Sequence, residues 1–188
     1  MKVIIGSAVK QVGWVSTTIA RFNILNEVHW LQFPGLTALF AEHVWEHLTP
    51  EEGRRAAELC YRFLEPGGYI RVAVPDGLHP DESYIAWVSP GGTGPGCGNH
   101  KVLYNFASLA QVFLNAGFDI RLLEYWDSAG GFNHVGWDSA DGLVRRSYVY
   151  DKRNTDSVPR YTSVILDAEK PRRERYVSSS DDRSRALP

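Results

Sequence analysis

Short apolar runs separated by helical patterns predict the central part of the fold. Three runs bounded by turn residues, at 3–5, 36–41 and 69–74, are typical of strands buried on both faces. Between the last two, apolar residues recur at helical spacing, after the N-terminal signal Thr49-Pro50-Glu51-Glu52: Ala56, Leu59, Cys60, Phe63 and Leu64. A strand, a helix and a strand in this order indicate a βαβ unit and hence a parallel sheet.

Weaker patterns extend this assignment to the rest of the chain. We expect further strands at 14–17, 22–25, 118–126 and 161–168, and helices at 26–33 and 105–116. Residues 75–104 are a long Gly/Pro-rich connection that contains Gly91-Gly92-Thr93-Gly94-Pro95-Gly96, and such connections commonly serve as lids or binding loops. Residues 127–160 are polar and irregular, and we expect them to join the last two strands as a hairpin.

Composition limits the class of protein and its surroundings. The chain has 188 residues and predicts one domain over 1–169, followed by a charged, Ser-rich tail over 170–188 that we expect to be disordered. The formal net charge of −2 indicates no nucleic-acid or anionic-membrane partner, and no apolar run approaches the roughly 18 residues of a bilayer span. Two cysteines are too few for a disulfide framework, and with no signal-peptide pattern a cytoplasmic location is expected. A homodimer is left open.

The stretch AEHVWEHL, residues 41–48, contains His43-Val44-Trp45-Glu46-His47, which matches the H-x-x-E-H spacing of one class of zinc peptidases. Such a site needs both histidines on one sustained helix. Here a strand runs into the motif and a helix begins only at Thr49, so a zinc hydrolase is a remote alternative and we expect no metal ligands. The same position is the loop beyond the carboxyl end of a parallel strand, where α/β folds bind ligands.

The segment LFAEHVWEHLTPEEGRRAAELCYRFLEPGGYIRVAVPDG resembles the central part of class I S-adenosylmethionine-dependent methyltransferases. The later segment HKVLYNFASLAQVFLNAGFDIRLLEY is similar to the following part of that family, with its His, helix, AGF turn and strand. The resemblance covers most of residues 2–168. It implies a Rossmann-like α/β fold with a seven-stranded sheet, mostly parallel with one antiparallel strand, flanked by helices. It also implies S-adenosylmethionine as methyl donor and a small-molecule acceptor.

The resemblance places the methyl donor over the ends of the first strands. It implies donor contacts by Gly6, Ser7 and Ala8 in the glycine-rich turn, by Thr18, by Asn23, and by Glu42 and His43. Two of these positions depart from the family pattern. Ala8 stands where a glycine is expected, and Thr18 stands where a carboxylate grips the ribose hydroxyls; a threonine cannot form the same two charge-assisted hydrogen bonds.

Candidate groups for chemistry lie on the loops that follow the strands. His43 or His100 is the expected base, because a histidine titrates near neutral pH. Glu46, His47, Asp76 and Tyr104 are the candidate contacts to the acceptor. Two functions are therefore weighed: a small methyltransferase, and a methyltransferase-fold protein that has lost methylation and serves as a binding module or runs other chemistry in the same pocket.

Overall fold

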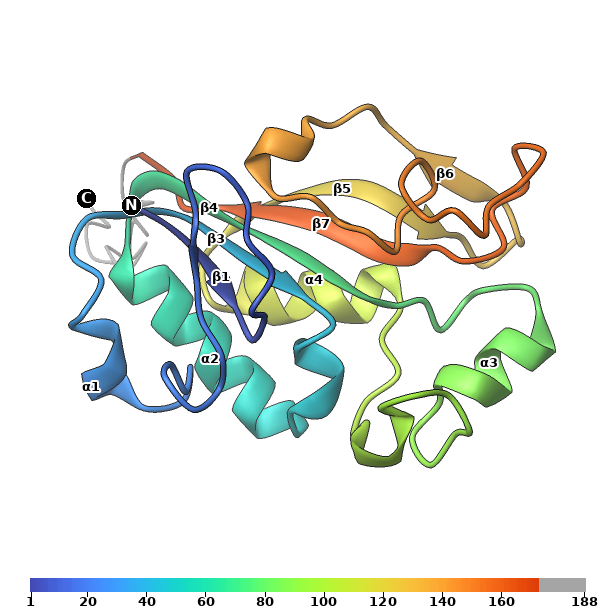
Figure 1. Ribbon diagram of the computed structural model, residues 1–188, viewed down its shortest axis with the longest axis horizontal. Coiled ribbons are helices and arrows are strands. Elements are labelled where there is room, and N and C mark those ends of the chain that lie inside the picture. Colours follow the sequence, from blue (N-terminus) through green and yellow to red (C-terminus); the bar gives the residue numbers. More distant parts are fainter. Residues whose placement is uncertain (173–188) are drawn as a thin grey trace, which may run out of the picture.

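The computed structural model describes residues 1–172, so positions 173–188 of the expected disordered tail lie outside the described residues (Figure 1). Seven strands form one sheet: β1 (Lys2–Ile5), β2 (Val15–Ser16), β3 (Leu36–Glu42), β4 (Leu64–Pro75), β5 (Asp119–Trp126), β6 (Phe132–His134) and β7 (Ser163–Glu169). The helices are α1 (Glu27–Trp30), α2 (Pro50–Phe63), α3 (Glu82–Val88) and α4 (Phe106–Asn115), with short 3-10 turns η1 (Trp45–His47), η2 (Cys97–Asn99) and η3 (Ser139–Asp141).

The sheet order is β2-β1-β3-β4-β7-β5-β6. The four strands β2, β1, β3 and β4 are parallel, as the βαβ pattern predicts. The expectation of one antiparallel strand is wrong, because β7 runs antiparallel between β4 and β5, and β6 runs antiparallel to β5 at the edge. The part of the sheet from β4 to β6 is therefore built of antiparallel strand pairs. The expected hairpin is present as the β5–β7 pair, with β6 inside its long connection.

The N-terminus of α2 has the cap that the sequence predicts. The Thr49 side chain accepts a hydrogen bond from the Glu52 backbone N–H (3.3 Å), and the Glu52 carboxylate accepts one from the Thr49 N–H (2.9 Å). This capping box satisfies two N–H groups that have no partner inside the helix. Helix α2 therefore begins directly after the loop at 43–48, and its N-terminus adjoins that loop.

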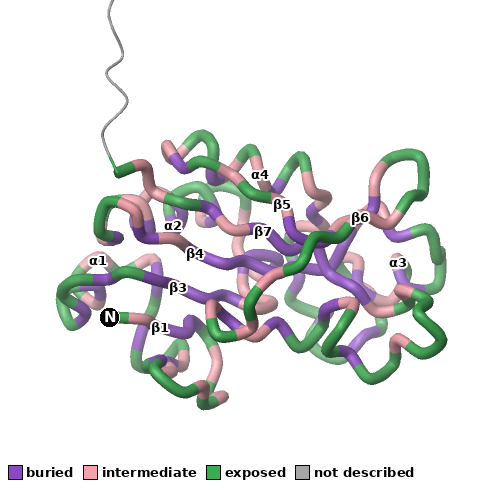
Figure 2. The backbone as a smooth tube through the Cα atoms, turned by 90° about the horizontal axis from the view of Figure 1, so that it is seen from above, coloured by how far each residue is buried: buried purple, intermediate pink, exposed green. Residues whose placement is uncertain are grey.

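The two faces of the sheet are covered differently, because alternate strand residues point to opposite sides. Val3, Ile5, Leu39 and Ala41 face α2 and α4 in the larger core. Ile4, Ala38 and Phe40 face a smaller cluster that includes Val144 and Ile165. Figure 1 shows α2 and α4 on one side of the sheet and the connection 127–160 on the other, and Figure 2 shows that the central strands are largely buried.

Arg71 ties the connection 127–160 to the second face of the sheet. Its guanidinium donates to both Asp167 oxygens (2.7 and 2.9 Å) and to the carbonyls of Asp138 (2.8 Å) and Gly142 (3.0 Å). The cation also lies 4.9 Å from the centroid of the Trp137 ring. Because the buried guanidinium has this many acceptors, it fixes the position of the connection 127–160 relative to β4 and β7.

Three local expectations need correction. Residues 22–25 are not a strand; Phe22 packs edge-to-face against Trp30 and Phe33, which explains the apolar run without sheet pairing. Helix α3 lies inside the expected loop 75–104, where the Asp81 side chain caps it by accepting from the backbone N–H groups of Ser83 and Tyr84. Strand β6 lies inside the connection that we expected to be irregular. Within residues 1–172, every helix is too short or too polar to cross a bilayer.

Candidate functional site

A cavity of about 540 Å³ lies beyond the carboxyl ends of β1 and β3, against the start of α2. Its size is within the range of small-molecule sites, roughly 300–1,000 Å³. The wall is mostly aliphatic and aromatic with a few polar groups: Ile5, Gly6, Ile19, Phe22, Asn23, Ile24, Leu25, His43, Val44, His47, Leu48, Glu52 and Asn99. This edge of a parallel sheet is where α/β folds bind ligands. Four of the residues expected at the site meet here, namely Gly6, Asn23, His43 and His47.

Gly6 ends β1 in a conformation that favours glycine, with φ of +72°. A Cβ at this position would also lie 3.0 Å from the Val44 Cγ2 atom, closer than side chains pack. The absence of a side chain lets the β1 turn approach the 43–48 loop. Gly6 therefore shapes the cavity wall where the end of β1 meets the 43–48 loop.

The other residues expected to contact the donor are spread over both faces of the sheet. Thr18 immediately precedes Ile19 of the cavity wall, and its carbonyl accepts from the N–H groups of Arg21 and Phe22 (both 2.9 Å). Ala8 is exposed in the segment after β1. Ser7 lines a separate cavity of about 60 Å³ on the opposite face.

Glu42 lines that same small cavity, away from the main one. Its carboxylate accepts from the backbone N–H groups of Arg145 (2.7 Å) and Arg146 (3.0 Å). The structure therefore gives Glu42 the task of holding the connection 127–160. It does not bring Ser7 or Glu42 to the main cavity.

Polar groups within the cavity are partly engaged by the protein itself. Asn23 is exposed, and its side-chain oxygen accepts from the Leu25 N–H (2.9 Å), an Asx turn. Its amide nitrogen faces no acceptor among residues 1–172 that would fix it. Glu52 is the one carboxylate among the described wall residues, and it is bound in the α2 capping box. No free carboxylate in the described part of the wall therefore replaces the acid that Thr18 lacks.

His43 and Glu46 form a hydrogen-bonded pair at the cavity. His43 has a φ of +55°, and its Nδ1 lies 2.8 Å from the Glu46 Oε1. Since a carboxylate only accepts, Nδ1 carries the proton, and the pairing orients the ring. The Nε2 atom lies 3.4 Å from the Ser163 Oγ, but that hydroxyl is buried and donates to the Arg146 carbonyl (2.8 Å). The serine is therefore a structural neighbour, and the oriented imidazole is the group suited to proton transfer.

His47 and His100 are brought together from distant parts of the sequence. His47 lies in η1 and lines the cavity, whereas His100 follows η2 and is buried behind it. Their rings meet edge-to-face with centroids 4.7 Å apart. The His100 Nδ1 donates to the Val88 carbonyl (2.7 Å). His100 thus supports His47 from inside, and His43 is the better placed of the two expected bases.

Asp76 and Tyr104, the expected acceptor contacts, are both in the interior. Asp76 is fully buried; its carboxylate accepts from the backbone N–H groups of Leu78 (2.9 Å) and Trp126 (2.7 Å), and burial raises its pKa to about 6. Tyr104 belongs to the larger core, where burial raises the pKa of its hydroxyl to about 12. These two side chains join β4, β5 and α2 and do not reach the cavity wall.

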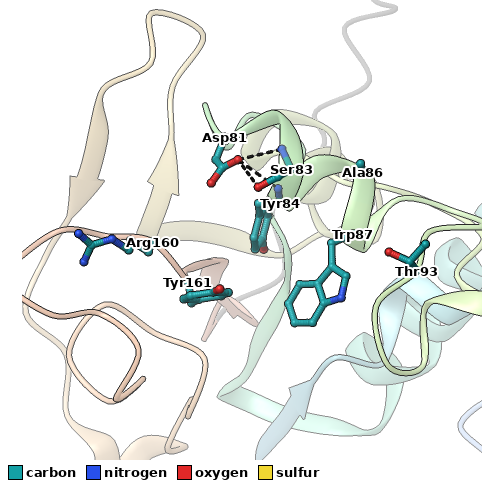
Figure 3. A pocket seen from close by; sticks show the side chains of 8 residues that line it. All are labelled: Asp81, Ser83, Tyr84, Ala86, Trp87, Thr93, Arg160 and Tyr161. Carbon is teal, nitrogen blue, oxygen red and sulfur yellow. Dashed lines mark hydrogen bonds between the residues drawn. The ribbon is translucent and has the colours of Figure 1, made fainter.

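A second cavity, of about 360 Å³, lies at α3 (Figure 3). Trp87 of α3 and Tyr161, which precedes β7, line it with rings 6.2 Å apart, and the Arg153 guanidinium lies 3.8 Å from the Tyr161 ring centroid. Thr93 adds the Gly-rich part of the 75–104 connection to the wall. Trp87 thus lines this cavity, whereas Trp126 is buried and packs against His79 and Phe132.

Several cavity residues lay outside the sequence-based expectation. Ile19, Phe22, Ile24 and Leu25 read as ordinary apolar positions, and Asn99 as part of a Gly-rich loop. For the four apolar residues, the only signal in the sequence is their place just after the second strand. Periodicity does not distinguish a wall residue from a core residue in so short a segment.

Comparison with solved structures supports the fold. The structure is similar to a SAM-dependent methyltransferase from Archaeoglobus fulgidus, with a TM-score of 0.51 and 16% sequence identity over 90% of this chain and 85% of that chain. An O-methyltransferase family protein from Burkholderia thailandensis (TM-score 0.48, 12% identity, 84% of this chain and 36% of that chain) also matches. So does a SAM-dependent methyltransferase from Thermotoga maritima (TM-score 0.47, 13% identity, 84% and 63%).

The chain thus spans little more than a third of the Burkholderia protein and less than two thirds of the Thermotoga protein. No protein-family profile matches the sequence, and a search of curated proteins finds no match. At these identities the similarity concerns the fold: a mixed α/β sheet of the Rossmann-like methyltransferase type.

Proposed function

We propose that this protein, whose fold is that of S-adenosylmethionine-dependent methyltransferases, binds S-adenosylmethionine in the cavity beyond β1 and β3 and methylates a small molecule. The observation that supports it is the juxtaposition of Gly6 and His43 at this cavity, at the carboxyl edge of the parallel strands. When bound, the donor supplies an already activated methyl group, so the protein has mainly to align the two reactants.

The residues present fit such a donor in size and in lining. The 540 Å³ cavity has an aliphatic and aromatic wall from Phe22, Ile24 and Leu25, suited to a flat apolar ring system. The Asn23 amide nitrogen can donate a hydrogen bond to a ring nitrogen of a base. Gly6 lets the backbone approach the ligand closely.

His43 is the group that we assign to proton transfer. Its Nδ1–H is held by Glu46, so the Nε2 side of the ring can accept a proton from a hydroxyl or amine acceptor. The acceptor would enter from the side of the 75–104 connection, which contributes Asn99 to the cavity wall. A net charge of −2 favours a small molecule over a nucleic acid.

Donor binding is tested by titration calorimetry of the full chain with S-adenosylhomocysteine. Ile19 lines the cavity and is 77% exposed, so Ile19→Trp blocks the cavity without disturbing the core. The matched control is Val149→Trp, which places the same ring at a 69% exposed aliphatic position in the connection 127–160. We expect binding by the wild type and the control and its loss in Ile19→Trp. Absence of heat with the wild type, together with no thermal shift, would refute the proposal.

A second function is that of a methyltransferase fold that has lost methylation. Two observations favour it: the Glu52 carboxylate is already bound in the α2 capping box, and Thr18 stands where the resemblance implies a carboxylate. Hydrogen bonds to a charged group contribute about 1.5–3 kcal/mol each, so Thr18→Asp should tighten donor binding by roughly tenfold or more if the ribose reaches this position. An inert wild type that binds donor only as Thr18→Asp would identify this second function. Thr18→Asn, which lacks the charge, is the control.

A further inference from the structure

Glu46, His47 and His100 form a cluster whose ligating atoms all lie within 4.8 Å of one another. Glu46 and His47 end η1, and His100 follows η2 more than fifty positions later in the sequence. The backbone brings them together, because the Glu46 carbonyl accepts from the N–H groups of Lys101 (2.7 Å) and Val102 (3.3 Å). The cluster is therefore built by the fold and does not depend on one flexible side chain.

Two polar atoms of the cluster are buried without a protein partner. The Glu46 side chain is only 1% exposed; its Oε1 accepts from His43, but its Oε2 has no hydrogen-bond partner within residues 1–172. The His47 Nδ1 is likewise buried and unpaired in the described part of the chain. Leaving a buried carboxylate oxygen unpaired is unfavourable, and a bound cation would satisfy it.

One of the two histidines, His100, is prepared for ligation by its other contact. His100 donates its Nδ1–H to the Val88 carbonyl, which leaves the Nε2 lone pair free. Metal-binding histidines almost always donate their second ring N–H to a carbonyl or carboxylate in this way. His43 plays the corresponding part for Glu46, since its Nδ1–H fixes the carboxylate from outside the cluster.

We propose that Glu46, His47 and His100 bind one divalent transition-metal ion of the Zn²⁺ type. Two imidazoles and one carboxylate are a ligand set of zinc and of non-haem iron, and both leave positions open for an exogenous ligand. Tetrahedral ligands with metal bonds near 2.0–2.1 Å lie about 3.4 Å apart, so side-chain rotations would have to bring the three ligating atoms, which lie within 4.8 Å of one another, closer together. The ion would neutralise the buried carboxylate.

This site differs from the H-x-x-E-H arrangement that the sequence suggests. In that arrangement His43 and His47 would be the ligands, whereas here His43 holds Glu46 and a distant histidine completes the set. His47 also lines the donor cavity, so the ion would lie at its wall. On the basis of the proposed function, its open position would take an oxygen of the methyl acceptor; metal binding itself does not depend on methyl transfer.

The test is a Zn²⁺ titration of the chelator-treated full chain, in competition with a chromophoric chelator, and a visible spectrum with Co²⁺. We expect one ion per chain in the wild type. His47→Ala, His100→Ala and Glu46→Gln should each weaken binding by about tenfold or more and change the Co²⁺ spectrum. His134→Ala, which removes an exposed histidine of β6, is the matched control and should bind like the wild type.

A wild type that takes up less than one equivalent of Zn²⁺ and of Co²⁺ overturns the proposal, as does undiminished affinity in folded His47→Ala. His47 is partly exposed, so this variant remains informative if Glu46→Gln or His100→Ala fails to fold, which circular dichroism would reveal. The same samples are titrated with S-adenosylhomocysteine. Metal binding without donor binding refutes the proposed function alone, and donor binding without metal binding refutes the metal site alone.

Discussion

Replacing Arg71 tests how the connection 127–160 is held on the sheet. Arg71 is 2% exposed and makes a two-point ion pair with Asp167, whose side chain is 15% exposed, plus two hydrogen bonds to backbone carbonyls. Arg71→Met removes the cation, keeps much of the packing volume, and leaves the Asp167 charge and both carbonyls without their donor. Breaking a buried pair in this way costs about 3–5 kcal/mol.

The second change separates the charge from the packing. In Arg71→Met with Asp167→Leu, the uncompensated carboxylate is gone, and replacing a buried pair by apolar residues is often neutral or stabilising. We therefore expect the double variant to recover at least about half of the loss, the two carbonyls still lacking their donor. Both variants are measured by urea unfolding at pH 7, followed by tryptophan fluorescence and circular dichroism.

Two results would refute this reasoning. A loss below about 1 kcal/mol in Arg71→Met would place the pair in the class of weak surface ion pairs. A double variant as unstable as the single one would show that the carbonyl contacts and the Trp137 ring, rather than the buried charge, carry the stabilisation.

Three further predictions concern single positions. Gly6→Ala should lower the free energy of unfolding by about 1–2 kcal/mol and weaken donor binding, because of the positive φ and the Val44 contact. The control Gly130→Ala has a similar φ and open space around it, so it should lower the free energy of unfolding but leave the donor affinity measured by calorimetry unchanged. Asp76 has a raised pKa of about 6, so its contribution to stability is fully present below the unfolded pKa near 4 and is lost as pH rises through 6, by up to about 3 kcal/mol. In urea unfolding from pH 4 to 7.5, the difference in free energy of unfolding between wild type and Asp76→Ala should therefore shrink with rising pH. A constant difference would contradict the assignment. Thr49→Ala should cost about 0.5–2 kcal/mol in thermal or urea unfolding through loss of the α2 cap, and an unchanged stability would be inconsistent with the capping box.

Local signals in the sequence were sufficient for the βαβ unit. The cap at Thr49 and the apolar spacing of α2 depend on neighbours within a few residues, and the structure confirms both. The position of β7 between β4 and β5 depends on pairing between distant segments, which no local pattern encodes. The same limit applies to 22–25, where the partners of Phe22 are Trp30 and Phe33 and not a neighbouring strand.

The candidate site likewise has parts that local sequence signals predict and parts that depend on contacts between distant segments. The sequence predicts that the loop after β3 lies at the carboxyl edge of the parallel strands, and Gly6 and His43 meet there. Glu42 precedes His43 by one residue but points to the other face, as the alternation of Phe40 and Ala41 between the two clusters already implies. The approach of His100 to Glu46 could not be predicted, because it depends on backbone hydrogen bonds across the long 75–104 connection.

The central position of β7 has a consequence for how the chain acquires its structure. Ser163–Glu169 pairs with both β4 and β5. Until these residues have left the ribosome, the edges of β4 and β5 in the nascent chain therefore have unpaired backbone groups. The β2-β1-β3-β4 half can assemble as it is made, whereas the β5–β6 half must wait for one late segment to join it. A premature stop before Ser163 would therefore leave two aggregation-prone pieces of sheet rather than a shortened but working protein.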